Sequence, residues 1–296
     1  MAIREHIRHP LEWSADQLRT ANLAVERASH SLHSPTGADD ATRPAIRKIE
    51  LADLADVLAS GLRDFGAYRT DVIFLCIIYP LAGLVLASVA FGYDLLPMLF
   101  PLASGFALIG PVAAVGLYEM SRRREQGVEI TWADAFGVVS APAFGAILVL
   151  GLILLAIFLV WLAAAWAIWS MTLGPVPPAS LGAFMHQVLT TGAGWAMILV
   201  GVGVGFLFAL LVLAISVVSF PLLLDRNVGL RTAVATSLRA VLVNPGPMAA
   251  WGLIVAGGLV LGSIPVLLGL IIVMPVLGHA TWHLYRKVVP RAPTDG

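Results

Sequence analysis

Cysteine is almost absent from this sequence, since Cys76 is the only one in 296 residues. A single cysteine excludes a disulfide within the chain and a zinc site built on cysteine ligands. Its expected role is that of a small buried apolar side chain. The formal net charge is zero, so the charge balance gives no indication of a nucleic-acid partner.

Charged residues are also scarce. They make up 12% of the chain, about half of the roughly 25% that soluble globular proteins carry. Hydrophobic residues make up 59%, and the mean hydropathy is +0.89. We therefore predict an integral membrane protein. The first residues, MAIREHIRHPLEW, contain no apolar core, so we expect no secretory signal there.

Long apolar runs predict the architecture, because a membrane-spanning helix needs about 20 apolar residues. The last apolar tract, residues 248–284, is too long for one span, and we divide it at GSIP, residues 262–265. The prediction is an all-α, polytopic membrane protein with about six spans in three hairpins. The expected spans are residues 72–92, 95–117, 143–171, 195–224, 248–262 and 265–284. A single long helix or a re-entrant segment is the alternative for the last tract.

The predicted membrane domain covers residues 49–288. A polar N-terminal arm, residues 1–48, precedes it, and a short tail, residues 289–296, follows it. In the arm, Leu11 and Leu18 begin an apolar repeat of seven residues that predicts a short amphipathic helix, followed by a linker. This helix either lies on the membrane or the protein body, or docks a partner.

The distribution of basic residues predicts the orientation. With six spans, all 18 Lys and Arg residues fall before the first span or after the second, fourth and sixth spans. Cytoplasmic loops are enriched in Lys and Arg, so we expect both termini to be cytoplasmic. A protein with five spans would instead place Arg286, Lys287 and Arg291 outside.

Amphipathic helices are expected before the hairpins. Residues 230–242 place leucines and valines on one helical arc and Thr236 opposite them. Residues 51–65 place leucines on one arc and acidic residues, Asp64 among them, on the other. Residues 128–145 are a shorter third candidate. Helices of this kind lie in the membrane interface, with their arginines near anionic headgroups of the cytoplasmic face.

Several polar residues follow the fourth span. Asp225 and Arg226 lie at its end, where Asp225 is expected to cap the next helix or to pair with Arg231. Asn244 and Pro245 begin the sequence NPGP, which breaks helix continuation. These residues are candidates for a structural or functional role.

His279 and His283 are four residues apart and share one face of the sixth predicted span. A histidine pair at this spacing could bind a metal or a haem. One helix supplies only two ligands, however, and no acidic or cysteine partner stands nearby in the sequence. We prefer the interpretation that both histidines bond backbone or headgroups, and we expect no metal and no cofactor. Pro275 and Tyr285 are further candidates on this span.

The predicted spans contain closely spaced glycines and lack charged residues in their deep parts. Gly258 and Gly262 are four residues apart, a spacing that lets helices approach closely, within the chain or between copies. The deep parts of the six spans carry no charge, which disfavours an ion-coupled transporter. No nucleophile triad, P-loop or metalloprotease motif is present, which favours a protein that is not an enzyme.

The stretch FPLLLDRNVGLRTAVATSLRAVLVNPGPMAAWGLI and the later MPVLGHATWHLYRK resemble a family of bacterial predicted integral membrane proteins, domain of unknown function 2189. The resemblance covers roughly residues 45–288. It implies a multi-pass protein of the bacterial inner membrane and implies no activity. The residues that carry it are Pro221, Asp225, Ser237, Asn244, Pro275, Gly278, His279, His283 and Tyr285.

Three functions follow as expectations. The first is a non-enzymatic accessory, assembly or scaffold component of the membrane, with a membrane protein or a second copy as partner. The second is a transporter or channel for a neutral or lipid-like solute. The last is a metal or haem redox protein that uses His279 and His283.

Overall fold

The computed structural model describes residues 44–67, 77, 80–81, 83–85, 88, 95–128, 135, 137–139 and 141–291. These residues form helices, turns and connecting segments, with no β-strand in the described ranges. The all-α class is therefore confirmed. The helices are α2 (Leu51–Ala67), η1 (Leu96–Met98), α5 (Leu99–Ala113), α6 (Val115–Glu125), α7 (Phe144–Thr172), α8 (Leu181–Thr190), α9 (Gly192–Ser216), α10 (Ser219–Asp225), α11 (Leu230–Val243), α12 (Pro245–Ser263) and α13 (Leu270–Val288).

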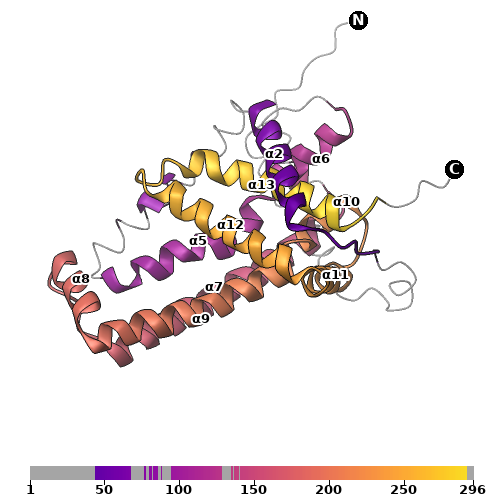
Figure 1. Cartoon of the computed structure of the whole chain (residues 1–296). Coiled ribbons are helices and arrows are strands. Elements are labelled where there is room, and N and C mark those ends of the chain that lie inside the picture. Colours follow the sequence, from indigo (N-terminus) through magenta and orange to yellow (C-terminus); the bar gives the residue numbers. More distant parts are fainter. Residues whose placement is uncertain are drawn as a thin grey trace, which may run out of the picture.

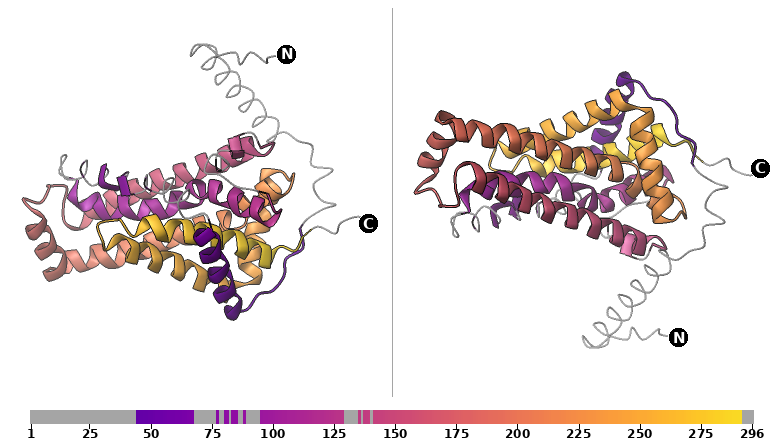
Figure 2. Two further views of the ribbon diagram at one scale, coloured as in Figure 1. Left: turned by 90° about the horizontal axis from the view of Figure 1, so that it is seen from above. Right: turned by 90° about the horizontal axis from the view of Figure 1, so that it is seen from below.

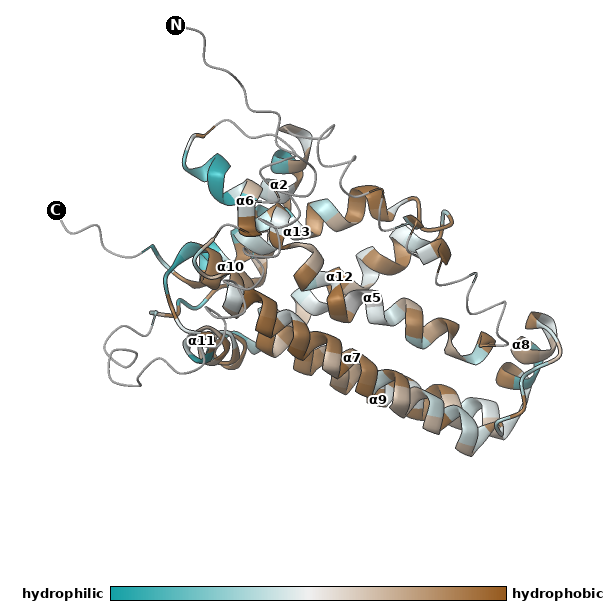
Figure 3. Cartoon of the chain, turned by 180° about the vertical axis from the view of Figure 1, so that it is seen from behind, coloured by the Kyte–Doolittle hydropathy of each residue, from teal (hydrophilic) through white to brown (hydrophobic). Residues whose placement is uncertain are grey.

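The helices form an elongated bundle (Figures 1 and 2). Helix α8 lies at one end, whereas α2, α6, α10 and α11 gather at the opposite end, close to both described chain ends. Colouring by hydropathy shows that α7 and α9 are mostly apolar and that hydrophilic residues concentrate near α2, α6 and α10 (Figure 3). The two ends of the bundle therefore differ in polarity.

Within the described residues, four helical segments are long and apolar enough to cross a membrane. They are Leu96–Glu125, Phe144–Thr172, Gly192–Asp225 and Pro245–Ser263, and they coincide with four of the predicted spans. Helix α13 is not one of them, because its second half carries histidines and the basic residues Arg286 and Lys287. Residues 72–92 lie mostly outside the described residues, so the count of six and the three hairpins stay predictions.

The last apolar tract consists of two helices rather than one. Helix α12 ends at Ser263 and α13 begins at Leu270, close to the predicted division. In the turn between them, Val266 and Leu267 adopt positive φ angles of 52° and 67°. This left-handed backbone cannot continue a right-handed helix, so the chain reverses here.

Small residues allow α12 and α13 to pack closely. A β-carbon added to Gly262 would lie 2.8 Å from Cδ2 of Leu270, and one added to Gly258 would lie 3.2 Å from Cγ1 of Val273. The glycine pair predicted from the sequence therefore packs within the chain, between these two helices.

Helix α2 packs across α13 through a face that the sequence did not predict (Figure 1). A β-carbon on Gly61 would lie 2.7 Å from the backbone nitrogen of Ala280, so only glycine allows this approach. Asp64 is buried on the same face, whereas Leu51 and Leu62 are 61% and 57% exposed. Asp64, predicted on the arc opposite the leucines, is buried together with Leu54 of the leucine arc, because close contact with α13 selects the face that carries Gly61.

Helix α11 also buries its small residues. Ala233, Thr236, Ser237 and Ala240 are buried, and Ser237 Oγ accepts a hydrogen bond of 3.2 Å from the backbone N–H of Val218. Leu242 is 78% exposed. A helix is thus present where the amphipathic helix was predicted, but Thr236 faces the protein rather than water. Eight residues of the third candidate, residues 128–145, lie outside the described residues, as does nearly all of the arm.

Candidate functional site

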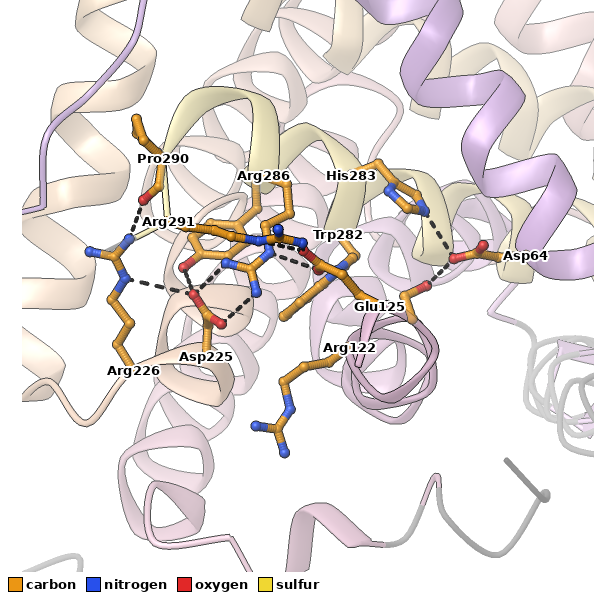
Figure 4. A network of polar contacts seen from close by, with 12 residues as sticks. Asp64, Arg122, Glu125, Asp225, Arg226, Trp282, His283, Arg286, Pro290 and Arg291 are labelled. Carbon is orange, nitrogen blue, oxygen red and sulfur yellow. Dashed lines mark hydrogen bonds and ion pairs between the residues drawn. The ribbon is translucent and has the colours of Figure 1, made fainter. Parts of the chain in front are cut away.

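A network of polar side chains joins α2, α6, α10 and α13 at the end of the bundle opposite α8 (Figure 4). It has two parts, both of which include residues of α13. We call Asp64, Ser121, His279 and His283 the histidine cluster, and Glu125, Asp225, Tyr285 and Arg286 the arginine cluster.

Asp64 is the centre of the histidine cluster. Its Oδ2 accepts a hydrogen bond of 2.7 Å from Ser121 Oγ and lies 2.9 Å from Nε2 of His283. Its Oδ1 accepts a hydrogen bond of 2.8 Å from Nη1 of Arg124. Because both carboxylate oxygens are bonded to other helices, Asp64 ties α2 to α6 and α13.

His279 lies beneath this carboxylate and is fully buried. Its Nδ1 is 2.8 Å from Ser121 Oγ. The Ser121 hydroxyl donates its proton to Asp64, so it accepts one from Nδ1 of His279. The neutral imidazole ring then has no hydrogen on Nε2. This buried nitrogen has no hydrogen-bond partner in the part of the chain that the structure describes.

The surroundings of Asp64 determine its charge. Burial raises the pKa of its carboxyl, because burial disfavours the charged form, but hydrogen bonds from His283 and Ser121 and the nearby histidines lower it more. The net effect is a pKa below the ordinary value of 3.8. Asp64 is therefore an ionised hydrogen-bond acceptor at neutral pH.

The arginine cluster is built around the guanidinium of Arg286. Its Nη1 and Nη2 donate to the two oxygens of Asp225, each at 2.7 Å, and its Nε donates to Glu125 Oε2 at 2.9 Å. The hydroxyl of Tyr285 donates to Asp225 Oδ2 at 2.5 Å, and the guanidinium lies 4.8 Å from the centroid of the Trp282 ring. This two-pronged geometry is the strongest that arginine and carboxylate form.

The position of Asp225 corrects the sequence prediction. It neither caps α11 nor pairs with Arg231, which is exposed on α11; instead it bonds Arg286 of α13. Arg226 lies 3.6 Å from Asp225 and donates to the backbone oxygen of Pro290. The partner lies 61 positions away, so local spacing gave no indication of it.

Asn244 joins two more distant segments. Its Oδ1 accepts a hydrogen bond of 2.8 Å from the backbone N–H of Ile49, and its Nδ2 donates to the backbone oxygen of Arg47 at 3.2 Å. Pro245 begins α12, at a position where no N–H donor is needed. The helix break predicted from NPGP is therefore confirmed, and Asn244 in addition fixes the segment, residues 44–50, that leads into α2. Pro275 lies buried inside α13.

The two histidines have different partners from those expected. The sequence analysis placed no acidic residue near them, but Asp64 lies against His283 across 219 positions. Within the described ranges, no group of three or more His, Cys, Asp or Glu side chains could hold a metal ion. Nε2 of His283 is hydrogen-bonded to Asp64, and Nδ1 of His279 is hydrogen-bonded to Ser121.

A second feature is an apolar cavity of about 500 Å³ between α5, α6, α9, α12 and α13. None of its lining residues is charged, and its polar side chains are Tyr118, Ser216 and Thr281. Ser216 Oγ and Thr281 Oγ1 donate to the carbonyls of Val212 and Leu277 in their own helices. The cavity can therefore hold an apolar molecule, whereas it offers no ion site.

Residues 98–225 match the family described as predicted integral membrane protein, domain of unknown function 2189. The match covers 128 of the 296 residues. The resemblance found in the sequence is confirmed, although the match covers the middle of the expected range, residues 45–288. No curated protein and no solved structure matches the chain significantly.

The family segment contributes only part of the polar network. Domain of unknown function 2189 ends at Asp225 in this chain and includes Ser121 and Glu125. Asp64 precedes the segment, and the contributing residues of α13, such as Arg286, follow it. The network therefore attaches the family segment to a helix before it and a helix after it.

Four residues of the network were not predicted from the sequence: Asp64 as a buried partner, Ser121, Glu125 and Arg286. One signal was present, because Arg286 directly follows Tyr285, a residue that the resemblance had singled out. The others lie on helices whose contacts involve separations of 57 to 219 positions, which a single sequence does not reveal.

Proposed function

We propose that this integral membrane protein is a non-enzymatic accessory, assembly or scaffold component of the bacterial inner membrane. The observation that carries the proposal is the polar network. The groups that could act in catalysis, among them Asp64, Ser121 and His283, are hydrogen-bonded between helices. Hydrogen bonds between helices make this end of the bundle rigid, and a rigid surface favours the binding of a partner protein.

We further propose that this end is cytoplasmic. The helix ends that carry basic residues gather there (Figures 1 and 2), and cytoplasmic segments are enriched in Lys and Arg. Residues 44–50 of the N-terminal arm lead into α2 at this end, so we propose that the arm, residues 1–48, binds a cytoplasmic or membrane partner.

Purification from native membranes in mild detergent tests the scaffold proposal. We expect a stable partner to be recovered with the full chain and lost after deletion of residues 1–43. A chain with a scrambled arm of the same composition is the matched control, and it should lose the partner as well. Recovery of the same partners with and without the arm contradicts the arm's role, and turnover of a substrate by the purified protein contradicts a non-enzymatic function.

A transporter for a neutral or lipid-like solute is the second candidate. The apolar cavity favours it, since the cavity walls suit a molecule without charge. Reconstitution in vesicles with fluorescent phospholipids distinguishes the two: a transporter accelerates the exchange of lipid between leaflets, whereas a scaffold leaves the exchange rate at that of empty vesicles.

A further inference from the structure

The cavity lies within the apolar part of the bundle. It is lined by residues within 206–216 of α9 and within 249–259 of α12, and both helices belong to segments long enough to cross a membrane. Its wall on α12 covers about 15 Å of helix, at 1.5 Å per residue. At this depth, the phase that surrounds the protein consists of lipid acyl chains.

The wall of the cavity is open between two helices. Helices α9 and α12 both line it and share few contacts, with Leu213 close to Gly252. Phe206, Leu210 and Leu253 line the cavity and are also 63%, 44% and 73% exposed. These three side chains form a rim that faces the surroundings of the bundle, so the opening faces hydrocarbon rather than water.

The inner part of the cavity is apolar and closed. Trp251, Met274 and Leu277 are buried there. The hydroxyl of Thr281 is bonded to a backbone carbonyl, so it does not require a polar ligand. An uncharged, unbranched apolar chain end suits these walls better than a polar headgroup, whose loss of hydration would be uncompensated.

Glycines provide the space. A β-carbon added to Gly110 would meet only Cε of Met274, at 4.0 Å, and one added to Gly252 would meet Cδ2 of Leu213 at 3.4 Å. Both glycines line the cavity. Larger side chains at these two positions can therefore grow into the cavity without a clash of their first atom.

We infer that this cavity binds one acyl chain of a membrane phospholipid, which enters methyl end first between α9 and α12. The volume of about 500 Å³ is within the range of small-molecule sites. The source of the chain follows from the location of the opening, since phospholipid tails are what an opening in this part of a membrane meets. Such a site goes beyond the scaffold function and is independent of any protein partner.

Photolabelling tests the inference. The full chain is placed in phosphatidylcholine nanodiscs that contain a phosphatidylcholine with a diazirine near the end of one acyl chain. We expect adducts on buried cavity residues, Trp251 and Leu277 among them. Gly110→Leu should lower these adducts about fivefold, because the leucine side chain would occupy the space that the lipid acyl chain needs. Gly252→Leu is a second filling variant.

Gly203→Leu is the matched control, because Gly203 lies on α9 outside the cavity and an added β-carbon has no atom within 4 Å. It should leave the adducts unchanged. Adducts confined to exposed side chains, or equal yields in folded Gly110→Leu and Gly252→Leu proteins, would overturn the inference. So would a disulfide between Cys76 and a cysteine introduced at Gly252, since that result assigns the cavity to the chain's own apolar stretch, residues 72–92.

Discussion

Arg286 donates two hydrogen bonds of 2.7 Å to the two carboxylate oxygens of Asp225, across 61 positions of sequence. The pair joins the end of α10 to the end of α13, and both side chains are mostly buried. Glu125 of α6 shares the same guanidinium. The ion pair is therefore a junction of three helices.

Substitution of Asp225 tests this junction. Asp225→Ala should lower the free energy of unfolding by about 3 kcal/mol, because it leaves a mostly buried guanidinium without one of its partners. Reversible unfolding in SDS measures the change. Arg286→Lys should also destabilise the protein, since an ammonium cannot form both bonds. The exposed control Arg231→Ala should change stability by less than about 0.5 kcal/mol, and an equal effect of Asp225→Ala and Arg231→Ala contradicts the prediction.

The approach of α2 to α13 depends on a single glycine. Gly61→Ala places a β-carbon 2.7 Å from backbone atoms of α13, so we expect a loss of about 1–3 kcal/mol and faster hydrogen exchange along α2. Gly66→Ala in the same helix is the matched control, because an added β-carbon there has no atom within 4 Å. That control should be neutral or slightly stabilising. Similar exchange rates in the two variants would mean that α2 does not pack as described.

Asn244 satisfies a buried backbone donor. Asn244→Ala removes the acceptor for the Ile49 N–H, and a buried donor without a partner costs about 1–3 kcal/mol. Exchange of the Ile49 amide hydrogen should become faster, as mass spectrometry of the corresponding peptide can show. Asn244→Asp keeps the acceptor, so it should protect this amide better than Asn244→Ala does. The opposite order contradicts the role of Asn244 Oδ1.

Acid should weaken the histidine cluster through Asp64. Its folded-state pKa lies below the ordinary 3.8, so the unfolded chain binds a proton more readily than the folded chain. The stabilisation is present above the unfolded value and is lost as the pH falls through the folded value. Thermal unfolding measured between pH 3 and pH 7 should show this loss below about pH 4.

Two variants separate Asp64 from other carboxylates in that experiment. Asp64→Asn removes this titration. The slope of the free energy of unfolding against pH should therefore decrease on the acid side by up to about 1.4 kcal/mol per pH unit, which corresponds to the binding of one proton. Ser121→Ala removes one of the hydrogen bonds that lower the pKa of Asp64 in the folded state, so the loss of stability in acid should be smaller than in the wild type and should be complete at a higher pH. An unchanged profile in both variants would falsify the assignment.

The long apolar helices could be predicted from the sequence, and the contacts between them could not. Residues 143–171 were predicted as a span, and α7 covers Phe144–Thr172, because hydropathy alone determines where an apolar helix can lie. The break between α12 and α13 was predicted near its observed place. Asp64, in contrast, was assigned to the water-facing arc, since amphipathic patterns treat charged residues as exposed. Its burial depends on Ser121 and His283, which no local pattern connects to it.

The separation between Asp64 and His283 also has a consequence for biogenesis. Helix α2 is synthesised near the beginning of the chain, whereas its partner α13 is synthesised almost at the end, 219 positions later. Protein synthesis proceeds from the N-terminus, and segments fold as they become available. The family segment, residues 98–225, is therefore made while α2 still lacks its docking surface. Helix α2 can therefore dock only after α13 has emerged from the ribosome. A chain that ends before Ala280 would leave the face of α2 around Gly61 exposed.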